Sequence, residues 1–387
     1  MNILFLMHRF IGFGGIEMVT KNLAIELNAK FSHTIKIFSI VQQDVNKETF
    51  LSPNYDVYVA HSNSKKGILV EFKEYLNRFD FDILVFQDSY ARIEFLLKEA
   101  IKKDIPIITV EHNSPDCFIK SYRQITSKKK EEGASWFRLL IRSIRYRLLV
   151  NNEKKRRENL IKLSKRYILL SNRYKPTLKQ YYGIESDRIQ AITNPVKFKS
   201  NEFNSQKKNI ALFVGRLTVD KGVDMLMEVW SKLEHRLPDW KLVIVGEGPE
   251  REHIVKEIID RNLQRIELHG FTDNIGYYYK DASVLLMTSR FEGLALIIAE
   301  AMAFGVVPFI FNSFESLYDI VENGKDGYII NAFDTNEFAN SIERFVNLPE
   351  DDKTTMRNNA VIKSKKFSLE AIVIEWNNLF NKILNKQ

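Results

Sequence analysis

The stretch 210–233, "IALFVGRLTVDKGVDMLMEVWSKL", decides the fold of the C-terminal half of the chain. Its first residues form an apolar run that predicts a buried strand, and a loop containing two glycines follows. The last part of the stretch, 223–233, has apolar residues at helical spacing, which predicts a helix. A buried strand followed by a helix is the repeating unit of a parallel α/β sheet, so this stretch predicts a doubly wound domain.

The same order of strand and helix extends in both directions from this stretch. Further buried strands are predicted at 241–247, 265–271, 282–289 and 306–312, and, in the N-terminal half, at 2–8, 34–41, 82–87, 106–112 and 166–171. A polar stretch that begins with Pro195 separates the two series. We therefore expect an α/β fold of two doubly wound domains, residues 1–196 and residues 197–366.

Composition excludes several classes of protein. The chain has 387 residues, of which 45% are hydrophobic and 27% charged, as in soluble globular proteins. No apolar run approaches the roughly 20 residues of a membrane-spanning helix, and the first residues lack the pattern of a secretory signal. Cys117 is the only cysteine, so an intrachain disulfide is impossible. We expect a cytoplasmic protein.

The positive charge is concentrated in residues 120–166. This segment has a net charge of +12, whereas the whole chain has +8. Helical spacing places Arg138, Arg142 and Arg145 on one face. The apolar residues roughly opposite are Trp136, Phe137, Leu140, Ile144 and Leu148. Such a helix either contacts an anionic membrane, where each basic residue contributes about 1 kcal/mol, or packs on its own domain with its arginines solvated.

Charged residues and glycines follow the predicted strands, where doubly wound domains bind their ligands. Arg216 and Lys221 lie on either side of the loop that leads into the helix of the opening stretch. Together with the positive end of that helix they suit a pyrophosphate, although each cation alone could be a solvated surface charge. In "GFGGIE", Gly15 could let backbone amides approach an anion or could simply form a tight turn.

Two carboxylates, with seven residues between them, lie in the apolar stretch 289–302, "SRFEGLALIIAEAM". Glu292 precedes a predicted helix, and Glu300 lies within it among aliphatic residues. Burying Glu300 there is unfavourable unless another group hydrogen-bonds to it or it takes up a proton. We therefore expect a hydrogen-bonding partner for Glu300.

These motifs resemble a known family. The stretches "VGRL", "DKG", "IVGEGP", "HGF", "SRFEGLALIIAEAMAFGVVP" and "ENGKDGYII" occur in the order found in GT-B fold retaining glycosyltransferases of family four. The resemblance implies two Rossmann-like domains that face each other across a cleft. It also implies that residues 1–196 lie on the acceptor side, that residues 197–366 bind a nucleotide sugar, and that a last helix, 367–387, packs back on the first domain.

The resemblance also implies roles for the residues at the strand ends. Arg216 and Lys221 would hold the donor diphosphate, Glu292 would contact the donor sugar, and Glu300 would accept hydrogen bonds from the ribose. The backbone amides of Gly293, Leu294 and Ala295 would face the departing phosphate, although the family often has Gly-Phe-Gly at these positions. His112 would point toward the donor sugar, and Gly15 would touch the donor phosphate or the acceptor.

The implied activity is transfer of a sugar, with retained configuration, from a nucleotide diphosphate sugar to a hydroxyl group. A UDP-sugar is the favoured donor, and a glycan or lipid-linked glycan of cell-surface polysaccharide synthesis is the expected acceptor. We expect neither a metal nor a further cofactor, because "DFD" at 80–82 comes before a strand, where a turn or cap is typical. The alternatives are a GT-B fold sugar-nucleotide epimerase and a basic nucleic-acid-binding protein; no nucleic-acid motif supports the latter.

Overall fold

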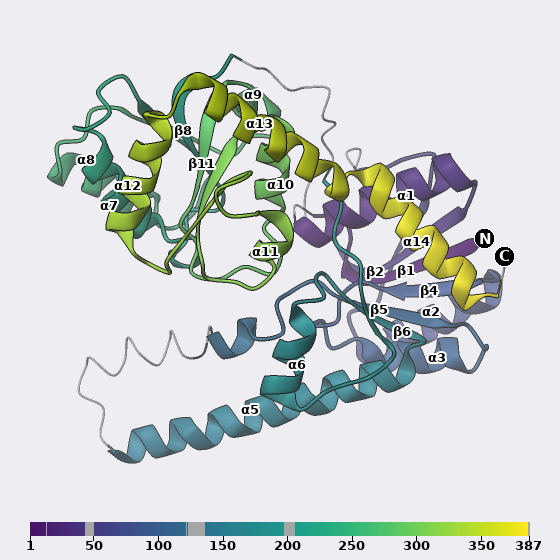
Figure 1. Cartoon of the computed structure of the whole chain (residues 1–387). Coiled ribbons are helices and arrows are strands. Elements are labelled where there is room, and N and C mark those ends of the chain that lie inside the picture. Colours follow the sequence, from purple (N-terminus) through teal and green to yellow (C-terminus); the bar gives the residue numbers. More distant parts are fainter. Residues whose placement is uncertain (13, 43–49, 121, 123–135, 197–205, 386–387) are drawn as a thin grey trace. The chain divides into compact units, whose positions relative to one another are not determined.

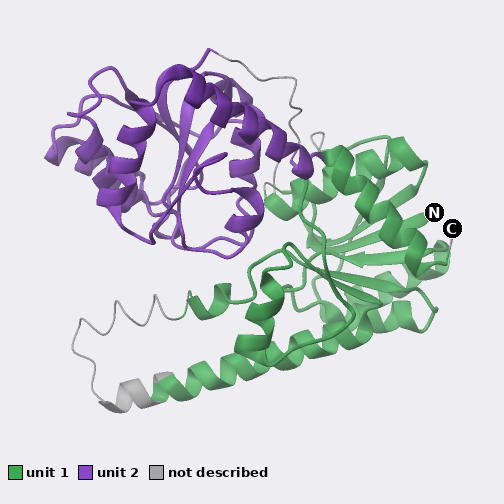
Figure 2. Ribbon diagram, in the orientation of Figure 1, with its two compact units in different colours: residues 1–195, 369–387 green, residues 196–368 purple. Residues whose placement is uncertain are grey.

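The chain forms two compact units in the computed structural model (Figures 1 and 2). The structure describes all residues except 13, 43–49, 121, 123–135, 197–205 and 386–387. Unit 1 comprises Met1–Pro195 and Leu369–Gln387, and unit 2 comprises Val196–Ser368. Part of the polar stretch after Pro195 and part of the basic segment therefore lie outside the described residues.

Unit 1 is built on a sheet of seven parallel strands in the order β3-β2-β1-β4-β5-β6-β7. The strands are β1 (Asn2–Arg9), β2 (Thr34–Val41), β3 (Asp56–Val59), β4 (Ile83–Phe86), β5 (Ile107–Glu111), β6 (Arg166–Leu169) and β7 (Ile189–Ala191). The central strands are almost fully buried, as expected for a parallel sheet with helices on both faces. The order reverses beside β1, which places the ligand-binding edge at the carboxyl ends of β1 and β4.

The helices of unit 1 cover this sheet. They are α1 (Gly15–Phe31), α2 (Lys65–Arg78), α3 (Leu97–Ile101), α5 (Trp136–Leu163), α6 (Tyr174–Tyr182) and α14 (Leu369–Ile383). The last of these, α14, packs against α1 (Figure 1). Ile372 and Trp376 of α14 are buried, and the Nε2 atom of His33, just after α1, lies 2.8 Å from Asn377 Oδ1. The C-terminal helix thus completes the core of the first unit.

Unit 2 has a sheet of six parallel strands in the order β10-β9-β8-β11-β12-β13. The strands are β8 (Lys208–Val214), β9 (Lys241–Val245), β10 (Ile266–His269), β11 (Ala282–Met287), β12 (Val307–Phe311) and β13 (Tyr328–Ile330). The helices are α7 (Val223–Leu233), α8 (Arg251–Asp260), α9 (Gly276–Asp281), α10 (Leu296–Ala303), α11 (Leu317–Ile320), α12 (Thr335–Val346) and α13 (Glu350–Ser364). The order reverses beside β8, so the equivalent edge of unit 2 lies at the ends of β8 and β11.

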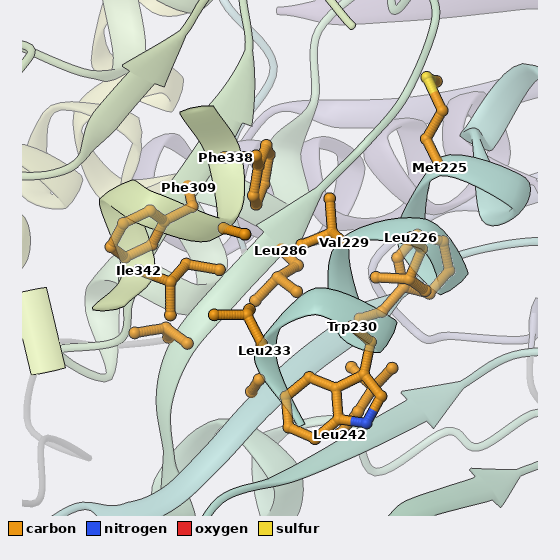
Figure 3. Close-up of a cluster of buried hydrophobic side chains, with 14 of the residues drawn as sticks. Met225, Leu226, Val229, Trp230, Leu233, Leu242, Leu286, Phe309, Phe338 and Ile342 are labelled. Atoms are coloured by element: carbon orange, nitrogen blue, oxygen red, sulfur yellow. The ribbon is translucent and has the colours of Figure 1, made fainter. Parts of the chain in front are cut away.

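Alternate residues of the unit 2 strands point to opposite faces and form two cores. Phe213 and Leu286 pack with Trp230 of α7 and with α12 on one face (Figure 3). Leu212 and Leu285 pack with α10 on the other face. Burial on both faces explains why these strands are continuous apolar runs in the sequence. The predicted α/β fold of two doubly wound domains is confirmed.

Candidate functional site

The loop after β8 carries Arg216 and leads into the short helix that carries Lys221, the second predicted cation. Arg216 is exposed, and within the described part of the chain its guanidinium makes no ion pair. Lys221 ends the short 3-10 helix η4 (Val219–Lys221). Gly222 follows with a φ of +66°, and a Cβ there would lie 2.0 Å from the Thr288 carbonyl oxygen. Only glycine fits this junction, which brings the start of α7 against the end of β11.

The structure brings Lys221 and Glu292 together. The Nζ atom of Lys221 donates a 2.6 Å hydrogen bond to Glu292 Oε1. The two side chains are largely buried, with exposed fractions of 19% and 12%. A cation that can bind phosphate and a carboxylate that can bind a sugar hydroxyl therefore share one position at the carboxyl edge of the unit 2 sheet.

The residues between the two predicted glutamates lead into α10. Helix α10 begins at Leu296, and Ala295 is its N-cap without a side-chain hydrogen bond. The carbonyl of Gly293 accepts a hydrogen bond of 2.9 Å from the hydroxyl of Ser316. This contact fixes the path of Gly293 and Leu294 toward the helix start, where backbone amides can face an anion.

Glu300 has the partner that the sequence demanded, and that partner is Tyr279 of α9. The phenol of Tyr279 donates a 3.3 Å hydrogen bond to Glu300 Oε2. Burial raises the pKa of Glu300 to about 7, and the Tyr279 hydrogen bond partly opposes this rise. Glu300 therefore titrates near neutral pH, and a ligand hydroxyl that donates to it would favour its charged form.

The loop after β9 joins the loop after β8 at the same sheet edge. Gly246 has a φ of +149°, and a Cβ there would lie 1.9 Å from the Gly215 carbonyl oxygen. The backbone amide of Leu217 donates to the Glu247 carbonyl at 2.9 Å, and the amide of Glu250 donates back to the Leu217 carbonyl at 3.0 Å. These bonds hold the residues around Arg216 in a fixed backbone frame.

In unit 1, the predicted glycine loop leads into α1. Gly14 is the N-cap of α1, and Gly15 is its first residue. A Cβ on Gly15 would meet nothing within 4 Å, so the backbone at this helix start can be approached closely. Arg9 Nε donates a 2.6 Å hydrogen bond to the buried Glu17 Oε1 just beyond this turn.

His112 follows β5 and is buried with both ring nitrogens engaged. Its Nε2 lies 2.7 Å from Gln87 Oε1, and its Nδ1 lies 3.2 Å from Asn194 Nδ2. These partners correspond to a neutral ring that donates from Nε2 and accepts at Nδ1. Burial lowers the pKa of His112 to about 4. At neutral pH the ring is therefore uncharged.

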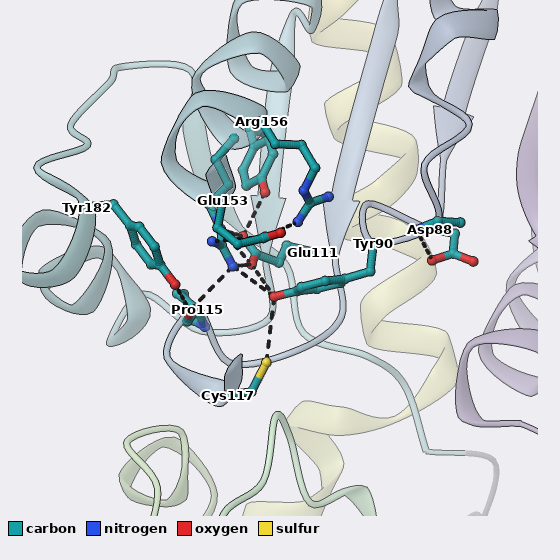
Figure 4. Close-up of polar contacts among 11 residues, drawn as sticks. Asp88, Tyr90, Glu111, Pro115, Cys117, Glu153, Arg156 and Tyr182 are labelled. Carbon is teal, nitrogen blue, oxygen red and sulfur yellow. Dashed lines mark hydrogen bonds and ion pairs between the residues drawn. The ribbon is translucent and has the colours of Figure 1, made fainter. Parts of the chain in front are cut away.

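The residue before His112 is the centre of a buried polar network (Figure 4). Arg157 of α5 pairs with Glu111 at 2.6 Å, and both side chains are almost completely buried. The phenols of Tyr90 and Tyr167 each donate to Glu111 at 2.7 Å. Although burial raises the pKa of Glu111, Arg157 and these hydrogen bonds hold it below its usual value. The network anchors α5 to the end of β5, beside His112.

Sequence reasoning missed the residues that hold the predicted ones in place. Tyr279, Gln87 and Asn194 are ordinary polar residues that acquire a role only through their spatial neighbours. The one feature of the sequence that could have indicated two of them is their place after a strand. Gln87 directly follows β4, and Asn194 lies three residues beyond β7. Asp82, of the "DFD" stretch, accepts a hydrogen bond from the Asn2 backbone amide and so tethers the start of β1.

The described residues contain no group of three or more His, Cys, Asp or Glu side chains arranged to hold a metal ion. Within the same residues, no helix is long and apolar enough to cross a membrane.

The basic segment contains the long helix α5. Its side chains are described at position 141 and from 143 onward, so the predicted face of Arg138 and Arg142 lies outside the described side chains. Ile144 and Leu148 are 50% and 57% exposed, and Arg145 is exposed as well. Figure 1 shows this half of α5 extending past α6. Among the described residues, no helix or strand covers the apolar side chains of Ile144 and Leu148.

Comparison with known proteins identifies the family. Residues 196–363 match the model of the glycosyl transferases group 1, and residues 13–199 match the model of glycosyltransferase family 4. The N-acetylgalactosaminyltransferase of Campylobacter jejuni that acts on an undecaprenol-linked glycan is 27% identical over 54% of this chain and 58% of its own length. The amylovoran biosynthesis glycosyltransferase AmsD of Erwinia amylovora is 25% identical over 57% of this chain and 63% of its own length. This chain thus matches little more than half the length of these relatives.

Solved structures with the same fold cover almost the whole chain. HepE of Anabaena, solved in complex with UDP and glucose, has a TM-score of 0.74 at 16% identity and covers 99% of this chain and 100% of its own. Sucrose-phosphate synthase of Thermosynechococcus elongatus has a TM-score of 0.75 at 16% identity, with full coverage of both chains. These likenesses establish the fold. Because the two family models together span residues 13–363, the chain belongs to the glycosyltransferases of family 4 and group 1, which have the GT-B fold.

Proposed function

We propose that this protein transfers a sugar, with retention of configuration, from a UDP-sugar to a hydroxyl group of a glycan or lipid-linked glycan in cell-surface polysaccharide synthesis. The observation that carries the proposal is the 2.6 Å pair of Lys221 and Glu292, in the same domain as Arg216 of the loop after β8. The names of the relatives support the acceptor class, and the UDP complexes of the structural neighbours support the donor.

On the donor side, each residue has one task. Arg216 and Lys221 neutralise the diphosphate, Glu300 accepts hydrogen bonds from the ribose, and Glu292 accepts one from the sugar. The backbone amides of residues 293–295 face the phosphate oxygen that gains charge as the glycosidic bond breaks. The interaction between these amides and the phosphate oxygen becomes stronger as the negative charge on the oxygen grows, and this lowers the activation free energy of transfer.

In the transfer step, the acceptor oxygen bonds to the anomeric carbon while the bond from that carbon to the phosphate breaks. The acceptor proton passes to the departing phosphate oxygen, and the products are the glycoside and a nucleoside diphosphate. His112 is unsuited to be the base, because both its ring nitrogens are engaged and burial lowers its pKa to about 4. We assign it a neutral role, in which a hydrogen bond to the donor sugar would replace the bond to Gln87 or to Asn194.

We also propose that the reaction needs no metal ion. What supports this is the presence of two cations, Lys221 directly before the N-cap of α7, where the helix dipole adds to its charge, and Arg216 in the loop that leads to it. Chelation with EDTA, followed by addition of Mg²⁺ or Mn²⁺, should leave the turnover unchanged. A loss of turnover that either metal restores would overturn this part of the proposal.

A panel of UDP-, GDP- and ADP-sugars tests the function itself. One donor should raise the melting temperature and release its nucleoside diphosphate when undecaprenyl-diphosphate-linked acceptors are added. Lys221→Ala should strongly reduce both effects, whereas the matched change Lys232→Ala, on the following helix α7, should not. Formation of an isomerised sugar nucleotide without release would instead indicate an epimerase. Absence of any effect across the panel would contradict the proposal.

We propose that residues 144–148 of α5 contact the membrane that carries such an acceptor. Ile144 and Leu148 would enter the interface, and Arg145 and Arg147 would attract anionic headgroups. Replacing Ile144 and Leu148 by Ser, or Arg145 and Arg147 by Gln, should abolish salt-sensitive sedimentation with phosphatidylglycerol vesicles.

The matched control removes two exposed charges from elsewhere in unit 1. Lys175→Gln with Lys179→Gln, both on α6, should sediment like the wild type. Equal sedimentation of all variants, or of none, would assign α5 to the ordinary surface of the protein.

A further inference from the structure

The backbone carbonyls of the three η4 residues all accept hydrogen bonds from residues 288–290, which follow β11. Arg290 Nη1 donates to the Val219 carbonyl at 2.5 Å, and the Arg290 backbone amide donates to the Asp220 carbonyl at 2.8 Å. The Thr288 hydroxyl donates to the Lys221 carbonyl at 3.1 Å. The backbone that carries Lys221 is therefore tied, residue by residue, to the segment that carries Glu292.

The side chain of Arg290 adds a second attachment, to helix α7. Its two terminal nitrogens donate to the two carboxylate oxygens of Asp224, at 2.8 Å and 2.6 Å. Asp224 lies in the first turn of α7, two residues after Gly222. A guanidinium held at both nitrogens by a carboxylate has a defined plane, so Arg290 fixes the start of α7 relative to residues 288–292.

The other side of the same segment is held by two serines. The Ser313 hydroxyl donates to the Ser289 carbonyl at 2.7 Å, and the Ser316 hydroxyl donates to the Gly293 carbonyl at 2.9 Å. Residues 288–293 are thus bonded to η4 on one side and to the residues after β12 on the other. Lys221 and Glu292 are placed by this frame before any ligand arrives.

We propose that Arg290, together with Asp224, is a positioning residue that sets the distance between Lys221 and Glu292 and so aligns the donor sugar with its diphosphate. The inference rests on the proposed function, in which Lys221 holds the diphosphate and Glu292 the sugar. Small displacements of positioned groups reduce rates steeply, because the reacting atoms leave the geometry of the transition state. Arg290 touches neither reacting atom and acts through its two neighbours.

The test measures turnover and nucleotide affinity in Arg290→Gln, Asp224→Asn and the double variant. Each single variant should lower kcat at least tenfold, while the Kd of the free nucleoside diphosphate should change less than threefold, since its phosphates need Lys221 but not Glu292. The double variant should be no slower than Arg290→Gln, because both changes break the same bidentate contact. Arg290→Lys should retain more kcat than Arg290→Gln.

The control variant is Arg261→Gln. It breaks the ion pair between Arg261, at the C-terminal end of α8, and Glu257 of that helix. It should leave kcat unchanged. Arg290→Gln could fail to fold, which its melting temperature would show. Asp224→Asn then serves as the test, because the Asp224 side chain is 46% exposed and its replacement should disturb folding less.

Unchanged kcat in folded variants, or losses in Arg290→Gln and Asp224→Asn that multiply in the double variant, would overturn the positioning role alone. An inactive wild type that binds no nucleotide would overturn the proposed function and this inference with it.

Discussion

The ammonium of Lys221 donates a 2.6 Å hydrogen bond to the carboxylate of Glu292, a residue 71 positions later in the chain. The two residues come from different loops of one sheet edge. Their pairing holds both side chains in one orientation in the free protein, so the ligand that we propose, with a diphosphate and a sugar hydroxyl, would find both groups in place.

The first prediction concerns the cations. Lys221→Ala and Arg216→Ala should each weaken binding of the nucleoside diphosphate by about 1.5–3 kcal/mol, the usual value for a hydrogen bond to a charged group. Isothermal titration calorimetry measures the change. Lys232→Ala is the control, since Lys232 lies on the adjoining helix α7 and pairs with Glu228 instead. Unchanged affinity in both site variants would remove them from the diphosphate site.

A second prediction separates the two glutamates. Glu300→Gln should mainly weaken nucleotide binding, because Glu300 is assigned to the ribose. Glu292→Gln should leave nucleotide affinity within about threefold and should lower kcat, because its contact is to the sugar at the reacting centre. Titration of the free nucleotide and steady-state kinetics distinguish the two effects. An equal loss of nucleotide affinity in both variants would contradict the division.

The pH dependence of nucleotide binding follows from the burial of Glu300, which raises its pKa to about 7. In the proposed site the ribose hydroxyls donate to the ionised carboxylate, so affinity should fall by up to about tenfold for each pH unit below 7. Tyr279→Phe removes a hydrogen bond that lowers this pKa, so the midpoint should move to higher pH. Titrations at pH 6, 7 and 8 test both statements.

Glu300→Gln is the control for that series, because the nucleotide phosphates titrate in the same range. The variant should keep only the phosphate contribution. A wild-type curve that superimposes on the Glu300→Gln curve would show that Glu300 does not govern the pH dependence.

The stability of unit 1 in acid should depend on His112. Burial lowers its folded pKa to about 4, whereas an unfolded histidine titrates near 6.5. Between these values the unfolded state binds a proton that the folded state does not, so falling pH removes up to roughly 3 kcal/mol of stability. His112→Gln should lose less stability between pH 7 and pH 4.5 in urea unfolding than the wild type. The exposed His253→Gln should behave like the wild type, and identical acid sensitivity in all three would refute the assignment.

The buried pair of Arg157 and Glu111 should be a major determinant of stability. Arg157→Met leaves an unpaired buried carboxylate and should lower the free energy of unfolding by about 3–5 kcal/mol. Adding Glu111→Gln should recover part of the loss. Lys154→Met breaks an exposed pair on the same helix and should change stability by less than about 1 kcal/mol. Equal effects of Arg157→Met and Lys154→Met would contradict the role of the network.

Much of the fold could be predicted from apolar runs, and the exceptions share a cause. The strand predicted at 34–41 coincides with β2, and the helix predicted at 223–233 coincides with α7. The strands missed are β3, β7 and β13, each at an edge of its sheet and only three or four residues long. Edge strands are less buried than central ones, so they need no continuous apolar run.

The site was predictable only in part, for a similar reason. Lys221, Glu292 and Glu300 belong to motifs, and the structure pairs two of them directly. Arg290 and Tyr279 belong to no catalytic pattern, since their roles depend on which loop faces which after folding. An arginine in a loop and a tyrosine in a short helix have many possible partners, and only the sheet order selects one.

A crystal structure of the protein with its nucleotide sugar tests the central claim most directly. The account predicts the diphosphate at Arg216 and Lys221, the ribose hydroxyls within hydrogen-bond distance of Glu300, and a sugar hydroxyl on Glu292. Lys221 would then exchange its bond to Glu292 for one to phosphate. A nucleotide bound elsewhere, or one bound here with its sugar away from Glu292, would contradict it.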